Sequence, residues 1–164
     1  MQNSDKDPRS GTETGRGNFG EGLRGRDLAG RPFPPENAPA CFAQIKGEGV
    51  DFIRYVLPWT ALGGMEPGVY HEEYLAYLRK IFLAADAGGL SVLIDSAGEN
   101  PADIPQNPEE EDRFLETLRH AYRRLKSCKA VTGWTIPAKP GPGFSDRFTE
   151  KMREVNPCLR VYTA

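Results

Sequence analysis

The carboxylates that follow a short apolar segment are the residues of this chain best placed to do chemistry. Asp95 directly follows the segment 90–94, and Glu99 and Asp103 come soon after it. In α/β proteins, polar side chains just after a buried strand lie at the edge of the sheet that carries the active site. Paired carboxylates at such an edge suit hydrolysis of a glycosidic bond or binding of a hard cation. A solvated loop, with Asp95 capping nearby backbone amides, is the structural alternative.

Three further residues have types that suit a binding site. Arg54 falls in the middle of a predicted strand, where a charged side chain is costly unless it is paired or lines a site. Trp59 lies at the end of that strand and Trp134 within another. An indole ring stacks on a sugar or fills the core, so core packing is the alternative for both tryptophans.

Other kinds of chemistry lack the residues that they need. The only histidines, His71 and His120, each lie on a predicted helix among charged residues, which suits neither a metal centre nor a Ser-His-Asp arrangement. The glycine-rich run GRGNFGEGLRG opens onto no predicted helix, and no phosphate-binding G-x-x-x-x-G-K-[ST] pattern is present. Cys41, Cys128 and Cys158 have no metal-type spacing and are interpreted as free thiols. We therefore expect no cofactor and no metal.

Composition limits the partners of the chain. With 164 residues and a formal net charge of −2, it suits one globular domain and gives no electrostatic reason to expect nucleic acid or an anionic membrane. No apolar run is long enough for a transmembrane helix. The N-terminus lacks the apolar core of a secretory signal, so we expect a cytoplasmic location, with prior removal of a leader as the alternative. Residues 1–20 are polar and glycine-rich, so we predict a flexible tail before a single domain over 21–164.

The elements that must position these residues alternate along the chain. Apolar, β-branched and aromatic runs predict strands over 51–59, 90–95, 129–136 and 159–164, with a first, irregular strand over 22–30. Helical spacing of apolar residues predicts helices over 37–46, 71–89, 108–126 and 145–156, the last with Ser145 as its cap. Such alternation indicates a parallel sheet covered by helices, in either a doubly wound open sheet or part of an eightfold barrel.

Most of the chain from about Leu23 resembles glycoside hydrolase family 5, in the branch with endoglycoceramidase-like and steryl-glucosidase-like enzymes. The similarity lies in LRGRDLAGRPFPPENAPACFAQIKGEGVDFIRYVLPWTAL, YHEEYLAYLRKIFLAADAGGLSVLID and RHAYRRLKSCKAVTGWTIPAKPGPGF. It implies a TIM-barrel hydrolase that cleaves β-glycosidic bonds with retention, using two glutamates. The expected fold is therefore α/β, with parallel (β/α) units in an incomplete or reduced TIM-barrel-derived barrel of about five to six strands.

The resemblance assigns roles to some residues and departs from the family at others. Arg54 matches the family's arginine beside the nucleophile, Trp59 the aromatic at the next strand end, and Asp95 the aspartate of its D-P-H-Q segment, whose remaining residues this chain lacks. Ala138 and Lys139 stand where the family has the asparagine and the acid/base glutamate of N-E-P. An ordinary lysine ammonium is a poor proton donor at neutral pH. The nucleophile would lie on a strand near the end of a barrel, beyond the last strand here.

These departures predict a degenerate, shortened glycoside hydrolase-like protein, a pseudoenzyme without confident catalytic residues. The expected remnant of function is a weak carbohydrate site formed by Arg54, Trp59, Asp95, Glu99 and Trp134. Two alternatives stay open. One is an active β-glycosidase in which Asp95 and Glu99 have been recruited as new acid/base groups. The other is a non-catalytic interaction module that pairs through exposed strand edges, for instance as a homodimer.

Overall fold

The computed structural model describes residues 22–98 and 100–164, so the predicted tail over 1–20 and Glu99 lie outside the described residues. Within them the sheet has five strands, β1 (Gly25–Ala29), β2 (Phe52–Val56), β3 (Ser91–Asp95), β4 (Val131–Ile136) and β5 (Arg160–Thr163). Each strand is parallel to its neighbours, in the order β1-β2-β3-β4-β5. This confirms the α/β class and its parallel units. A doubly wound sheet reverses its strand order at a switch point, so the unbroken order favours a barrel-type arrangement.

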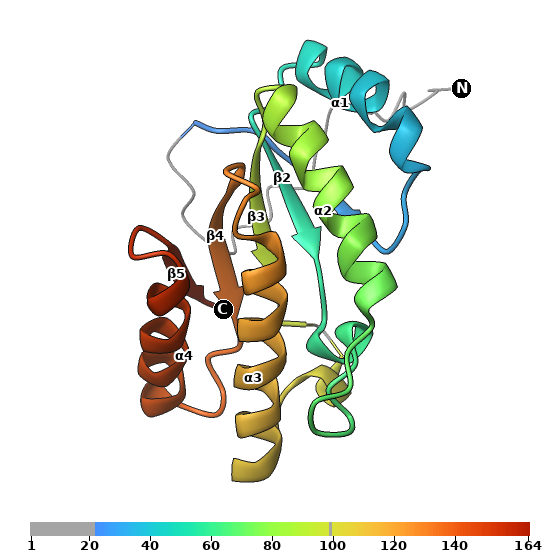
Figure 1. The fold of residues 1–164 in the computed structure, drawn as a ribbon. Coiled ribbons are helices and arrows are strands. Elements are labelled where there is room, and N and C mark those ends of the chain that lie inside the picture. The colour runs from blue at the N-terminus through green and yellow to red at the C-terminus, as the bar shows by residue number, and fades with distance from the viewer. Residues whose placement is uncertain (1–21, 99) are drawn as a thin grey trace, which may run out of the picture.

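Helices connect consecutive strands and lie against the sheet. They are α1 (Ala38–Gly47), α2 (Glu72–Ala87), α3 (Pro108–Leu125) and α4 (Pro142–Val155). Figure 1 shows α2, α3 and α4 standing in front of the sheet, as expected when each crossover has the same hand. Short 3-10 helices, η1 (Pro35–Asn37), η2 (Trp59–Leu62) and η3 (Pro101–Asp103), lie in the connections. In the described part of the chain, no helix is both long and apolar enough to cross a bilayer.

Helix α3 follows its sequence pattern closely. The Asn107 side chain accepts a hydrogen bond from the Glu110 backbone N–H at 2.9 Å, which caps the first turn. Acidic residues occupy that turn, and Arg123 and Arg124 the last turn, which suits the helix dipole. The apolar stripe is buried against the sheet and neighbouring helices through Phe114, Leu115, Leu118, Ala121, Tyr122 and Leu125.

Helix α4 begins earlier than predicted. It starts at Pro142, with Gly141 as its N-cap, so Ser145 lies within the helix and the prediction that it caps the helix was wrong. Proline is well tolerated at the first helical position because it lacks only an N–H that would be unpaired there. Gly141 adopts a φ of 126°, which glycine reaches without the steric cost that other residues bear.

The hydrophobic core lies between the sheet and the helices. Alternate strand residues, among them Tyr55 of β2 and Trp134 of β4, point toward the helices and are fully buried. Trp134 contacts Tyr122 of α3 edge-on, with ring centroids 5.6 Å apart. Because strand side chains alternate, the residues between them, such as Arg54, belong to the opposite face of the sheet. This second face carries the polar residues.

Candidate functional site

Arg54 is the central charged residue of this second face. Its Nη1 lies 2.7 Å from Asp27 Oδ2, and its Nε donates to Asp95 Oδ2 at 2.8 Å. The side chains of Arg54 and Asp95 are 7% and 2% exposed, and that of Asp27 is 40% exposed. The sheet register sets these contacts, because Asp27 lies directly opposite Arg54 and Asp95 lies opposite Val56, two residues farther along β2. Two carboxylates thus compensate a guanidinium that would be costly to bury alone.

Asp95 is held through both of its carboxylate oxygens. Oδ1 accepts a hydrogen bond from the Ala97 backbone N–H at 2.8 Å, while Oδ2 takes both contacts from Arg54, including one of 2.5 Å from Nη2. A carboxylate fixed in this way neutralises its partner and holds the start of the following loop. It has little freedom to act as a nucleophile or a base.

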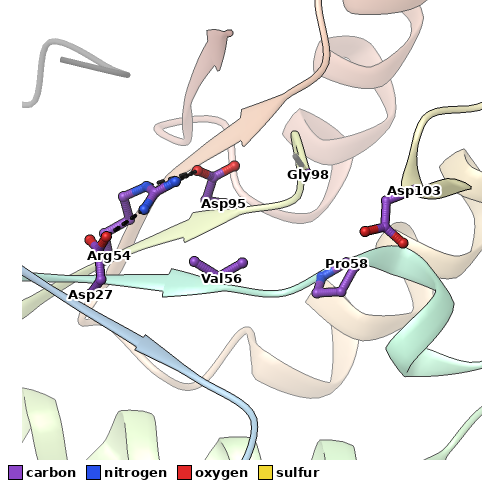
Figure 2. Close-up of a pocket in the computed structure, with 7 residues that line it drawn as sticks. All are labelled: Asp27, Arg54, Val56, Pro58, Asp95, Gly98 and Asp103. Carbon is purple, nitrogen blue, oxygen red and sulfur yellow. Dashed lines mark hydrogen bonds and ion pairs between the residues drawn. The ribbon is translucent and has the colours of Figure 1, made fainter. Parts of the chain in front are cut away.

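A cavity of about 270 Å³ opens beside this ion-pair cluster, at the end of the sheet toward which the strands run (Figure 2). Its lining consists of Asp27, Arg54, Val56, Pro58, Asp95, Gly98 and Asp103. In Figure 2 the Arg54 cluster lies at one end, Asp103 at the other, and Val56 between them. The volume lies just below the roughly 300–1,000 Å³ of drug-sized pockets, so it suits a small ligand.

The loop after β3 brings Asp103 to this cavity. Thr60 Oγ1 donates to Asp103 Oδ1 at 3.0 Å, and Trp59 Nε1 donates to the Asp103 carbonyl at 3.1 Å. Gly98 adopts a φ of +67°, and a Cβ there would lie 2.8 Å from Asp103 Cβ, so this close turn requires glycine. Within residues 22–98 and 100–164, no three His, Cys, Asp or Glu side chains are placed to hold a metal ion.

The two predicted tryptophans lie outside the cavity lining. Trp134 is fully buried, and its Nε1 donates to Ser96 Oγ at 2.9 Å. Trp59 is 3% exposed and packs beside Phe114, with ring centroids 6.0 Å apart. In this structure both rings therefore fill the core, which was the alternative interpretation of each.

The remaining candidate residues differ in whether they lie at the cavity. Arg54 and Asp95 come together, as a shared site requires. Ala138 and Lys139 are exposed in the turn between β4 and α4 and do not line the cavity. Glu99 lies outside the described residues.

Sequence reasoning misses two polar residues of this face, Asp27 and Thr135. Asp27 occupies the strand position opposite Arg54, and a search for acids able to pair with that arginine would have found it. Thr135 lies opposite Asp95 in the register of β3 and β4, is fully buried, and has no hydrogen-bond partner for its hydroxyl in the described chain. A buried hydroxyl without a partner costs free energy, so Thr135 marks an unused polar position beside Asp95.

Comparison with known proteins gives a consistent group of relatives. No family model matches the chain. A glucosylceramidase of Cryptococcus neoformans var. grubii is 43% identical over 65 residues, which is 40% of this chain and 9% of that protein. A glucosylceramidase of Aspergillus fumigatus is 32% identical over 124 residues, which is 76% of this chain and 13% of that protein. The chain thus corresponds to only a small part of the length of these relatives.

Solved structures place the fold among glycoside hydrolases. An endoglucanase of Pseudomonas stutzeri matches with a TM-score of 0.68 and 17% identity, over 89% of this chain and 52% of that one. A GH5_18 protein of Bifidobacterium longum subsp. longum, in complex with Manβ1-4GlcNAc, matches with a TM-score of 0.63 and 13% identity, over 86% and 43% of the two chains. The parallel units are therefore TIM-barrel-derived, as expected. The chain is a glycoside hydrolase-like chain, related to the glucosylceramidases and built on five strands of a barrel-type fold in its described part.

Proposed function

We propose that this chain is a degenerate glycoside hydrolase-like protein that has no hydrolytic activity and retains a weak carbohydrate site. The observation that carries the proposal is the cavity at the end of the sheet, which keeps Arg54 and Asp95 but has no acid from the turn after β4. That turn carries Ala138 and Lys139 at the positions that match the family's asparagine and acid/base glutamate.

The absence of activity follows from the chemistry of a retaining glycosidase. Such an enzyme needs one carboxyl group as acid/base and a second, about 5–5.5 Å away, as nucleophile. Ala138 supplies no acid, and the ammonium of Lys139 is a poor proton donor at neutral pH. Asp95 has both oxygens engaged by Arg54 and the Ala97 N–H, which disfavours it as a replacement nucleophile.

Carbohydrate binding is supported by the make-up of the cavity wall. Val56 and Pro58 offer apolar contact for the C–H face of a sugar ring, and the carboxylates of Asp27 and Asp103 offer acceptors for its hydroxyls. The cavity is small and has no tryptophan in its lining. We therefore expect a dissociation constant near the millimolar range, which corresponds to about −4 kcal/mol.

The proposal is tested by combining an activity assay with a binding assay on the full chain. We expect no turnover above buffer on a panel of fluorogenic β-glycosides, together with millimolar binding of D-glucose measured by isothermal titration calorimetry. Turnover that disappears in Asp95→Asn would contradict the proposal and favour recruited acids. Absence of binding to glucose, mannose and N-acetylglucosamine would contradict the retained site.

The alternative of a recruited active site makes a separate prediction. If Asp95 and Glu99 act as new acid/base groups, Glu99→Gln should abolish any turnover found on the glycoside panel. Unchanged rates in that variant would remove this alternative.

The sheet edges support a second candidate function, an interaction module. In the described chain, β1 pairs only with β2, and β5 only with β4, which leaves one side of each edge strand without a sheet partner. Unpaired edges of a parallel sheet attract pairing with other strands. Sedimentation equilibrium over a wide concentration range tests this candidate, and a concentration-independent monomer would contradict pairing with a second copy.

A further inference from the structure

The charges of the cavity lining are unequal. Asp27, Asp95 and Asp103 supply three carboxylates, and Arg54 supplies one guanidinium, so the described lining residues have a formal net charge of −2. The opposite charges of Arg54 and Asp95 compensate each other, because the two side chains are buried and in direct contact. Such a lining disfavours phosphates, sulfates and uronic acids and favours a ligand with positive charge.

The uncompensated charge is concentrated at the end of the cavity where Asp103 lies. Asp103 Oδ1 accepts a hydrogen bond from the neutral Thr60 hydroxyl, and the carboxylate makes no ion pair with any described residue. At the other end, Arg54 compensates much of the charge of Asp27 and Asp95. Figure 2 shows Asp103 separated from the Arg54 cluster by Val56.

A metal ion is a poor candidate for the ligand that neutralises the negative charge of the described cavity lining. In the described chain no set of three His, Cys, Asp or Glu side chains is arranged to bind one. The apolar surface of Val56 and Pro58 between the charged ends instead suits an organic ligand with a compact hydrophobic face.

We propose that this cavity binds an amino sugar, with the sugar ring over Val56 and Pro58 and the ammonium group beside Asp103. The inference rests on the proposed carbohydrate site and adds its charge preference. The Asp103 carboxylate, which has no ion-pair partner among the described residues, then compensates the ammonium, while Asp27 accepts hydrogen bonds from ring hydroxyls. A neutral hexose makes the same ring contacts and lacks the ion pair.

The experiment compares D-glucosamine, D-glucose and N-acetylglucosamine, which share one ring and differ in charge. Dissociation constants are measured by isothermal titration calorimetry on the full chain, at low salt and at a pH of about 6, where the sugar amine is protonated. We expect glucosamine to bind about fivefold more tightly than the two neutral sugars, the upper value for one partly exposed ion pair. Added salt should reduce that preference, because it screens exposed charges.

A matched pair of variants assigns the preference to Asp103. Asp103→Asn keeps an oxygen that accepts from Thr60 and removes the charge, so it should abolish the preference for glucosamine while glucose still binds. Asp146→Asn removes the same charge from an exposed position on α4, outside the cavity lining, and should leave the preference unchanged. A preference that survives in Asp103→Asn would overturn the assignment.

The outcomes separate the two proposals. Equal affinities for glucosamine and glucose would overturn the charge preference and leave the carbohydrate site standing. Binding of none of the three sugars would overturn the carbohydrate site itself, and the charge preference with it.

Discussion

Arg54 and Tyr55 are consecutive residues of β2 that face opposite sides of the sheet and have opposite roles. Arg54 reaches across the second face to Asp27 and Asp95, beside the cavity. Tyr55 points toward the helices, where its ring meets Phe82 edge-on with centroids 5.2 Å apart. The two faces of β2 thus differ: we expect the Arg54 face to bind a ligand, whereas the Tyr55 face stabilises the fold.

On the helix-facing side, two tyrosine hydroxyls donate to the same backbone carbonyl. The hydroxyl of Tyr55 donates to the Gly30 carbonyl, and Tyr74 donates to the same oxygen at 3.1 Å. Burial raises the pKa of Tyr55 above its ordinary value, and the neighbouring Tyr74 side chain raises it further. At the cavity, Asp103 is half-buried and free of ion pairs within the described chain. A polar group whose partners all lie within the protein stabilises the fold, whereas a carboxylate without an ion-pair partner is available to a ligand.

The largest expected effect is a loss of stability caused by a substitution on the helix-facing side of the sheet, outside the cavity lining. Trp134→Ala removes a fully buried ring and leaves Ser96 Oγ without the indole donor, so we expect a loss of about 3–5 kcal/mol in the free energy of unfolding. Urea unfolding followed by circular dichroism measures this loss. If the variant is as stable as the parent chain, Trp134 is not the core residue that the structure indicates.

The next effect concerns the buried ion pair. Arg54→Met leaves Asp95 buried without its cation, which should cost about 3 kcal/mol of stability. The double variant Arg54→Met/Asp95→Leu should recover most of this loss, because well-packed apolar residues often replace a buried pair at little cost. Urea unfolding of the two single variants and the double variant forms a cycle. Additive losses would show that the two side chains do not interact.

The smallest effect concerns the tyrosine hydroxyl and pH. Because the pKa of Tyr55 is raised in the folded chain, its contribution to stability is complete below the ordinary tyrosine pKa, about 10, and is lost as the pH rises above it. Tyr55→Phe removes the hydrogen bond to the Gly30 carbonyl, so the free energy of unfolding should fall by about 1 kcal/mol near neutral pH. It should also weaken the loss of stability at alkaline pH. Parallel alkaline curves for variant and parent, from urea unfolding at several pH values, would contradict this role.

Most of the fold could be predicted because it depends on local patterns. The run of β-branched and aromatic residues in β2 is visible in the sequence and predicts a strand. The apolar stripe of α3 is visible too and determines which face of that helix is buried. The start of α4 could not be placed, because Pro142 and Gly141 form a helix beginning without a polar cap. The site was only partly predictable. Arg54 and Asp95 follow from strand position, whereas the contribution of Asp27 depends on the pairing of β1 with β2.

An NMR titration tests directly whether the cavity between Arg54 and Asp103 binds carbohydrate. Amide resonances of the ¹⁵N-labelled full chain are followed as D-glucose is added. We predict saturable shifts at Val56, Gly98 and Asp103, with the Trp134 indole resonance unchanged because that ring is buried in the core. A different cavity is lined by Arg31, Phe33 and Tyr77, among other residues. No saturable shift at the Val56, Gly98 and Asp103 amides, or shifts confined to that other cavity, would contradict the carbohydrate site.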